Sequence, residues 1–313
     1  MISRPTLIAA LVVVELAIVG VAASALGLGH LMPVPGPLSM APPNLENLAG
    51  SVGAAATPLD RTFVTGPSPR VVVDVRDVDV TVEAGTAPNV RVDETLAVRG
   101  FVSGKIPPLV VEQMPDGIRV SASDSGSVHV MIGSVTHSLR IIVPPAARVE
   151  VSSAGTIDVS GLRAKLIAHT SDGSLRVHDH QGDLDVSTND GRLELVDVHG
   201  DAIDAIDHDG RIYLTRVGAD RLVAHSDYGR IVADGIRAVD GGLTTRDGRV
   251  LVSFAADSNA TADVSASDEI KVSGFSSVDG GANRRIVTLG AGRGHFEVST
   301  GDGFITITQG ANG

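Results

Sequence analysis

The chain has 313 residues, with 25 Lys and Arg against 37 Asp and Glu, and a formal net charge of -12 at pH 7. A surface with this charge repels polyanions, so nucleic acid is not an expected partner. Hydrophobic residues make up 43% of the chain, which is enough for a packed core. Because the chain has no cysteine, disulfides, thiolate metal sites and a catalytic thiol are excluded.

An apolar stretch runs from Leu7 to Gly29 and is interrupted only by Glu15. Its length predicts a transmembrane helix within residues 1–30, which would anchor an exported protein at the cytoplasmic membrane with the remainder facing outward. The membrane, reached through this helix, is therefore one expected partner. A cleaved signal peptide is the alternative, because Ala23-Ser24-Ala25 fits a cleavage site; cleavage after Ala25 would release a secreted protein.

Residues 31–69 are rich in Pro, Gly and Ala and show no sustained helical or strand period, which predicts an extended linker. From Arg70 onward polar and apolar residues alternate, as in RVVVDVRDVDVTVEA, and this period of two is typical of β-strands. The predicted fold class is therefore all-β. We expect an irregular N-terminal β-region at 70–148 and regular repeats with a C-terminal cap at 149–313.

A turn glycine recurs every 18 or 19 residues in the regular region. The residues two and four places after each glycine are almost all aliphatic, so each unit resembles one coil with two short strands. Such coils bury their apolar side only by stacking, which predicts a β-solenoid with coils of about 18–20 residues. The predicted turn glycines are Gly155, Gly173, Gly191, Gly210, Gly229 and Gly248, with Gly303 near the C-terminus.

Two further expectations concern the geometry of these turns. We expect glycine because a tight corner between strands favours a positive φ. We also expect Asp268 to occupy the turn position directly after Gly248, so that six steps from Gly155 would stack to about 29 Å.

Charged residues flank many of the turn glycines. Acids precede the glycines and arginines follow them in successive coils, so opposite charges on adjacent coils can pair. We therefore interpret these residues as a structural charge ladder, with a calcium site on its acidic side as the alternative. The ladder consists of Asp190, Arg192, Asp209, Arg211, Arg230, Asp247 and Arg249.

The histidines do not predict a metal site. Only His169 and His225 share a position relative to the turn, and three coils separate them by about 14 Å, too far for both to bind one ion. The best local cluster is His178-Asp179-His180, which is expected at the surface or in a turn.

Several aspartates could line one strand face without converging as the paired acids of a glycosidase do. The sequence thus predicts no catalytic residue, no metal site and no cofactor. The aspartates concerned are Asp183, Asp185, Asp201 and Asp204.

The run SLRIIVPPAARVEVSSAGTIDVSG combines a strand, a Pro-Pro turn and an S-x-x-G-x-I-x-V opening, and TSDG and STNDG units follow it. In this respect the chain, over about residues 70–309, resembles the bacterial putative-adhesin β-strand repeat family, an exported domain of unknown function. The resemblance implies a single-stranded, right-handed β-helix, often membrane-anchored, and brings no catalytic residues. The chain departs from the family pattern in the arginines after its turn glycines and in Asp268-Glu269, where glycine is expected.

These observations together predict a non-catalytic envelope or cell-surface β-solenoid that acts as an adhesin-like binding or scaffold module for a cell-wall or protein ligand. One alternative is a membrane-anchored accessory or sensor of envelope stress, whose anchor would contact a membrane partner. A polysaccharide lyase or hydrolase built on a β-helix is the other alternative, and it would require a groove lined by paired acids.

Overall fold

The computed structural model describes residues 59–104, 106–122, 128–275 and 278–310. These residues form 23 β-strands and no helix, so the all-β prediction is confirmed. None of the described segments is a helix long and apolar enough to cross a membrane. The helix predicted at 1–30 and most of the predicted linker lie outside the described residues.

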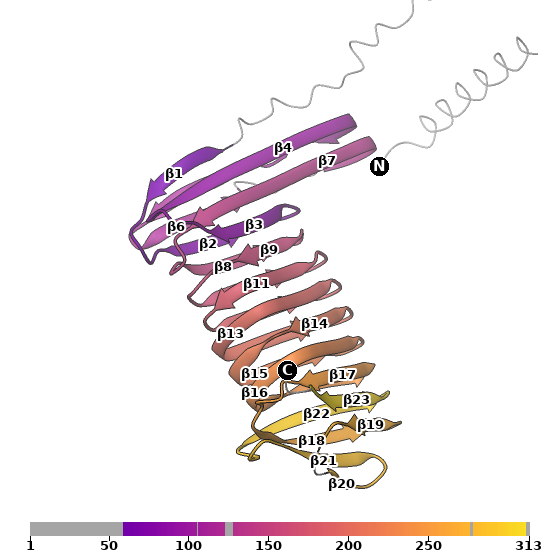
Figure 1. The fold of residues 1–313 in the computed structure, drawn as a ribbon. Coiled ribbons are helices and arrows are strands. Elements are labelled where there is room, and N and C mark those ends of the chain that lie inside the picture. The colour runs from indigo at the N-terminus through magenta and orange to yellow at the C-terminus, as the bar shows by residue number, and fades with distance from the viewer. Residues whose placement is uncertain (1–58, 105, 123–127, 276–277, 311–313) are drawn as a thin grey trace, which may run out of the picture. The chain divides into compact units, whose positions relative to one another are not determined.

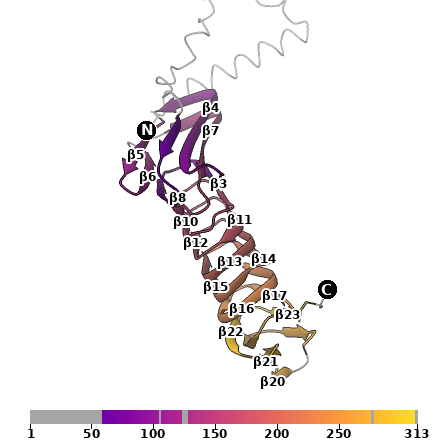
Figure 2. The same cartoon turned by 60° about the vertical axis from the view of Figure 1, so that its left-hand side comes forward.

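The strands wind around a stack of coils and form two sheets that face each other across the core. Figure 1 shows the stack from β4 and β7 at one end to β20 at the other, and Figure 2 shows β10 and β12 on one side with β11 and β14 on the other. In stack order, sheet A contains β5 (Leu109–Met114), β6 (Gly117–Ala122), β2 (Arg70–Asp74), β8 (Arg148–Ser153), β10 (Leu166–Thr170), β12 (Leu184–Thr188), the second half of β13 (Arg192–Asp207), β15 (Gly218–Ser226), the second half of β16 (Arg230–Asp247), β22 (Gly294–Asp302), β18 (Ala260–Ala266), β21 (Arg284–Leu289) and β20 (Val278–Gly280). Sheet B contains β1 (Asp60–Val64), β4 (Asn89–Gly104), β7 (Val128–Val143), β3 (Asp79–Ala84), β9 (Ile157–Ser160), β11 (Leu175–Gln181), the first half of β13, β14 (Arg211–Thr215), the first half of β16, β17 (Arg249–Phe254), β23 (Ile305–Gln309) and β19 (Ile270–Ser273).

The coils pair in parallel and in register, and their inward residues form the core. On sheet B, Leu175 pairs with Ile157 on one side and with Leu193 on the other, and all three side chains are fully buried. On sheet A, Leu166 pairs with Leu184 in the same manner. The aliphatic positions two and four places after the turn glycines therefore face the core, as the sequence predicts.

The stack does not follow the order of the chain at either end. Near the N-terminus, β2 and β3 lie between the coil of β6 and β7 and the coil of β8 and β9. Residues 70–84, within the region expected to be irregular, therefore form a coil that continues the regular stack. Near the C-terminus, β22 and β23 lie between the coil of β16 and β17 and the coil of β18 and β19.

The position expected for Asp268 is therefore wrong. Gly303 stacks directly beyond Gly248, and Asp268 follows one coil later, where its amide donates to the carbonyl oxygen of Gly303. The coil of β22 and β23, which lies between these two positions, is joined to β17 through the core. Phe296 of β22 packs edge-on against Phe254 of β17, with ring centroids 5.4 Å apart. This aromatic contact joins segments that the local repeat pattern does not connect.

Antiparallel strands extend both sheets at the N-terminal end of the stack and sheet A at its C-terminal end. At the N-terminal end β4 pairs with β7 and β1, and a hydrogen-bonding contact of 2.7 Å joins Nε2 of His137 to the carboxylate of Glu94. At the C-terminal end β21 pairs with β18 and β20. Such caps cover the sheet edges that a parallel stack would otherwise leave open to aggregation.

The turn glycines stack on one another so closely that no side chain fits. A Cβ atom on Gly191 would lie 1.9 Å from the carbonyl oxygen of Gly173, and one on Gly210 would lie 1.8 Å from that of Gly191. Among the seven predicted turn glycines, only Gly248 (φ 157°) and Gly303 (φ 135°) have a positive φ. The expected reason for glycine was therefore wrong, since the close approach of neighbouring coils and not the dihedral angle excludes other residues.

Positive φ angles are found instead at the opposite corner, where sheet B turns into sheet A. Six places after the turn glycine, five successive coils have φ values from 52° to 73°. Three of these residues are not glycine, because this corner leaves room for a side chain outside the stack. The five residues are Gly161, Asp179, Asp197, Arg216 and Gly235.

We predict that Gly191→Ala will destabilise the protein by about 2 kcal/mol or more, because the added methyl group must push two coils apart. Thermal and chemical unfolding followed by circular dichroism will measure the loss. Gly281→Ala is the matched control, since a Cβ there would meet no atom within 4 Å. Equal stability of the two variants would contradict the steric explanation.

Candidate functional site

A shallow groove runs along the edge where sheet A turns into sheet B. Its floor is the line of turn glycines, which cannot carry side chains, so the groove follows directly from the stacking of the coils. Acids border one side of this line and arginines border the other. The lining residues are Asp172, Ser174, Asp190, Gly191, Arg192, Asp209, Gly210, Arg211, Tyr228, Gly229 and Arg230.

The arginines of the predicted charge ladder form one continuous row, which we call the arginine row. Arg192 pairs in register with Arg211, Arg211 with Arg230, and Arg230 with Arg249, so like charges stack on four successive coils. All four side chains are exposed. Within the described residues, none of them has a carboxylate oxygen within 4.0 Å.

Two members of the arginine row contact aromatic rings. The guanidinium of Arg192 lies 5.1 Å from the ring centroid of Tyr213, and that of Arg249 lies 4.8 Å from the ring centroid of Phe304. These cation–π contacts hold the two arginines at the surface of the stack. Because no carboxylate of the described residues lies near the four arginines, the ion pairs expected within the ladder are not formed. The charges of the row face outward.

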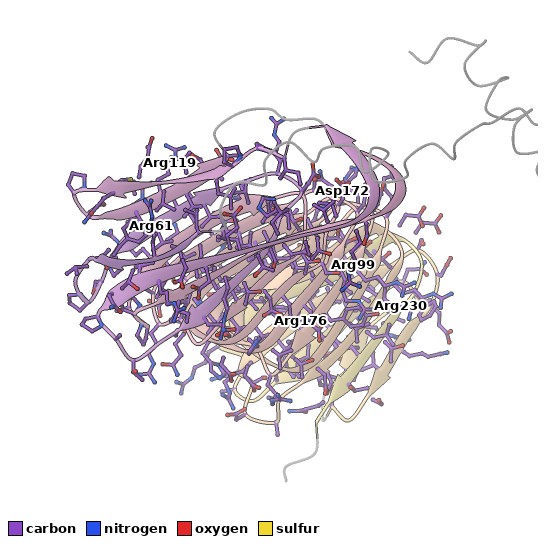
Figure 3. The ribbon with its side chains drawn as sticks, turned by 90° about the horizontal axis from the view of Figure 1, so that it is seen from above. Arg61, Arg99, Arg119, Asp172, Arg176 and Arg230 are labelled. Carbon is purple, nitrogen blue, oxygen red and sulfur yellow. The ribbon has the colours of Figure 1, made fainter. Side chains whose placement is uncertain are left out.

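The other side of the groove is an acidic row, formed by the residue before each turn glycine from Gly173 onward. Its members are exposed, and Tyr228, 51% exposed, takes the place of an acid in one coil. Figure 3 looks along the stack and shows Asp172 and Arg230 toward the side of the molecule away from Arg61 and Arg119. The acidic row consists of Asp172, Asp190, Asp209, Tyr228, Asp247 and Asp302.

Beneath the groove, buried hydroxyl groups tie the turns together. Thr170 donates to the carbonyl oxygen of Gly155 at 2.8 Å and accepts from the amide of Gly173 at 3.3 Å. Thr188 makes the same two bonds one coil further, to Gly173 at 3.5 Å and from Gly191 at 3.2 Å. Each hydroxyl therefore satisfies two backbone groups that would otherwise be buried without partners.

Asp207 occupies this same internal position in the next coil, and its side chain is fully buried. Neither carboxylate oxygen makes a hydrogen bond of good geometry, and the adjacent hydroxyls of Ser226 and Thr245 also lack partners among the described residues. Burial raises the pKa of Asp207 to about 6, and the nearby amides of Gly210 and His208 oppose this shift. The carboxyl group is thus most compatible with the core when it is protonated.

We predict that Asp207→Thr will stabilise the protein by up to about 3 kcal/mol above pH 6 and will change little below pH 4. A raised pKa in the folded state means that the stability contributed by the neutral acid is present at low pH and is lost as the pH rises through about 6. Threonine avoids this loss and can form the bonds that Thr188 forms. Unfolding free energies of both proteins between pH 3 and pH 8 will test the prediction. A pH-independent difference would contradict it.

A cluster of titratable groups, which sequence reasoning missed, lies beside the acidic row. The carboxylate of Asp227 lies 2.5 Å from Nδ1 of His208, 3.5 Å from Nε2 of His225 and 3.1 Å from Arg246. Partial burial raises the pKa of Asp227, but the hydrogen bond from His208 and the nearby cations outweigh it, so the pKa is lowered. The only signal in the sequence is that His208, Asp227 and Arg246 follow one another at intervals of 19 positions.

The histidines occupy different environments. His180 is fully buried, against the expectation of a surface position, because it lies in the corner column that Leu162 and Val198 occupy in the neighbouring coils. Burial lowers its pKa, and it therefore stays neutral in the core. His169 and His225 lie on the outer face of sheet A, where they contact the hydroxyls of Ser187 and Thr244.

Two of the four aspartates that could have lined a hydrolase site interact with neighbouring groups of the chain. Asp204 forms an ion pair with Arg221 at 2.9 Å, and Asp183 accepts a hydrogen bond from the amide of Ala202 at 3.2 Å. The described part of the chain also contains no group of three or more His, Cys, Asp or Glu side chains placed to hold a metal ion.

Parallel coils, a glycine-floored turn edge and antiparallel end strands define a β-solenoid repeat domain. The chain belongs to the Toastrack DUF4097 family, which matches residues 69–308. The resemblance to a putative-adhesin domain of unknown function is thereby confirmed. No curated protein matches the chain.

Three solved structures share low sequence identity with the chain. A putative cell adhesion protein from Clostridium sporogenes is 11% identical, with 81% of this chain and 100% of the other covered and a TM-score of 0.27. A putative adhesin from Bacteroides fragilis is 12% identical, with coverage of 82% and 98% and a TM-score of 0.40. A putative lipid binding protein from Parabacteroides distasonis is 10% identical, with coverage of 82% and 98% and a TM-score of 0.42.

Proposed function

We propose that this protein is a non-catalytic binding and scaffold module of the bacterial cell envelope, with the glycine-floored groove as its contact surface. The observation that supports this most directly is the pair of oppositely charged rows along the groove. The arginines of one row have no carboxylate partner in the described part of the chain, so a partner molecule can supply their counter-charge.

The groove favours a long partner over a compact substrate. The arginine row presents one arginine per coil over four coils, three of them in the groove, and parallel strands repeat at about 4.8 Å, so contacts accumulate along the stack. Each exposed charge contributes only about 0.2–1 kcal/mol, and useful affinity therefore requires several coils to be engaged together. A repetitive cell-wall polymer or a protein surface can do this.

We predict that the full-length chain will bind isolated bacterial cell walls freed of membrane and that the triple variant Arg192→Glu, Arg211→Glu and Arg230→Glu will lose most of this binding. The reversal makes the lining of the groove acidic and leaves Arg249 as the only arginine of the row, so most of the attraction for the anionic side of a partner is lost. Raising the salt concentration should weaken the wild-type interaction in the same direction.

Lys165→Glu is the control for this experiment. Lys165 is exposed and lies before β10, at the opposite edge of the stack, so reversing its charge changes the net charge without touching the groove. If both variants bind as the wild type does, the groove is not the contact surface.

We also propose that the chain is exported and held at the outer side of the cytoplasmic membrane by residues 1–30. The apolar stretch from Leu7 to Gly29 supports this location. Fractionation of the native cell, with an intact mass for the mature protein, will test it. We expect the complete chain in the membrane fraction; a released chain that begins at Leu26 would show that the stretch is a signal peptide and would remove the anchor.

A further inference from the structure

The groove carries two rows of opposite charge with the same repeat, and this arrangement is self-complementary. The acidic residue stands one place before the turn glycine and the arginine one place after it in every coil that carries both. A partner that neutralises both rows at once must present an acidic row and a basic row with the spacing of the coils. A second copy of this chain meets that requirement.

We propose that two copies of this chain associate side by side through their grooves, in parallel, about a two-fold axis that runs along the stacking direction. This inference deepens the proposed function and rests on it, because it names the partner of the same surface. A two-fold axis in this direction exchanges the two sides of the groove, so the arginine row of each copy faces the acidic row of the other.

The orientation follows from the order of the rows. An antiparallel pair, with its axis across the groove, would place arginine row against arginine row and would be repelled. The parallel pair keeps each coil level with the same coil of the second copy. Arg192 then faces Asp190, Arg211 faces Asp209, and Arg249 faces Asp247 of the second copy.

The one coil without an acid also fits this arrangement. In that coil Arg230 faces Tyr228 of the second copy, and an exposed tyrosine ring is a suitable partner for a guanidinium group. The side chains are complementary in length as well, since long arginines meet short aspartates across a floor that carries no side chains. Four stacked arginines that have no carboxylate partner among the described residues would therefore gain one carboxylate or aromatic partner each in the pair.

The test is a charge exchange in the full-length chain, purified in a mild detergent. Analytical ultracentrifugation should show a dimer that weakens in salt, with a dissociation constant that rises about tenfold or more between 50 mM and 500 mM NaCl. Arg211→Glu and Asp209→Arg should each weaken the dimer by about tenfold or more, because each places like charges opposite one another. The double variant R211E/D209R should restore it, since the exchanged charges face each other again across the axis.

Spin labels test the parallel orientation. The chain has no cysteine, so single cysteines at Asn189 and at Asp302 can be labelled without further changes. A parallel pair gives similarly short distances between equivalent labels at both positions. An antiparallel pair would separate equivalent labels along the stack by about 19 Å or more, the length of four coil steps, at one or both positions.

Each result decides between the alternatives. Restoration by the double variant and short label distances support the parallel dimer. A monomer at every concentration, or a dimer indifferent to Arg211→Glu, overturns it, and Lys165→Glu controls for net charge. If the chain is monomeric and yet loses envelope binding in the triple variant, the dimer is excluded while the proposed binding function stands.

Discussion

The close stacking of the turn glycines is the constraint on which the rest of the structure depends. The carbonyl oxygen of one glycine occupies the place where the next coil would otherwise carry a side chain. A Cβ atom added to any turn glycine from Gly173 to Gly248 would lie only 1.8 to 2.1 Å from the carbonyl oxygen of the glycine in the coil before it. This contact fixes the spacing of the coils along one edge. It also creates a bare floor, so the flanking residues become two separate rows. The groove is thus a consequence of the packing.

The inner side of the same edge shows how the fold tolerates polar groups. Thr170 and Thr188 each bridge two turns, and their bonds satisfy backbone groups of both turns. Asp207 stands in the same column without comparable bonds, and its pKa is raised because the carboxylate is buried. In this coil, directly beneath the groove, the carboxyl group therefore makes folding stability depend on pH. The neighbouring coils have hydroxyl groups in this column, which do not titrate in this way.

The ends of the stack depend on contacts between distant segments. The coil of β2 and β3 and the coil of β22 and β23 are each enclosed between two others, so both coils have paired neighbours on each side. Enclosure protects these coils from fraying and from pairing with other molecules. It also requires long-range pairing before the stack is complete, which slows folding relative to a strictly sequential repeat.

The sequence by itself determined the strands, the coil length, the inward residues and the two charged rows, because alternation and a fixed repeat reflect local chain geometry that every coil shares. It did not reveal that Gly303 stacks directly beyond Gly248, because similar coils have similar edges and can pair in more than one order. Contacts such as that of Phe254 with Phe296 decide which coil is next in the stack. It also placed His180 at the surface and paired the arginines with nearby acids. Only the tertiary structure decided these points, because burial and ion pairing depend on how side chains of neighbouring coils lie in space, and residue spacing does not specify that.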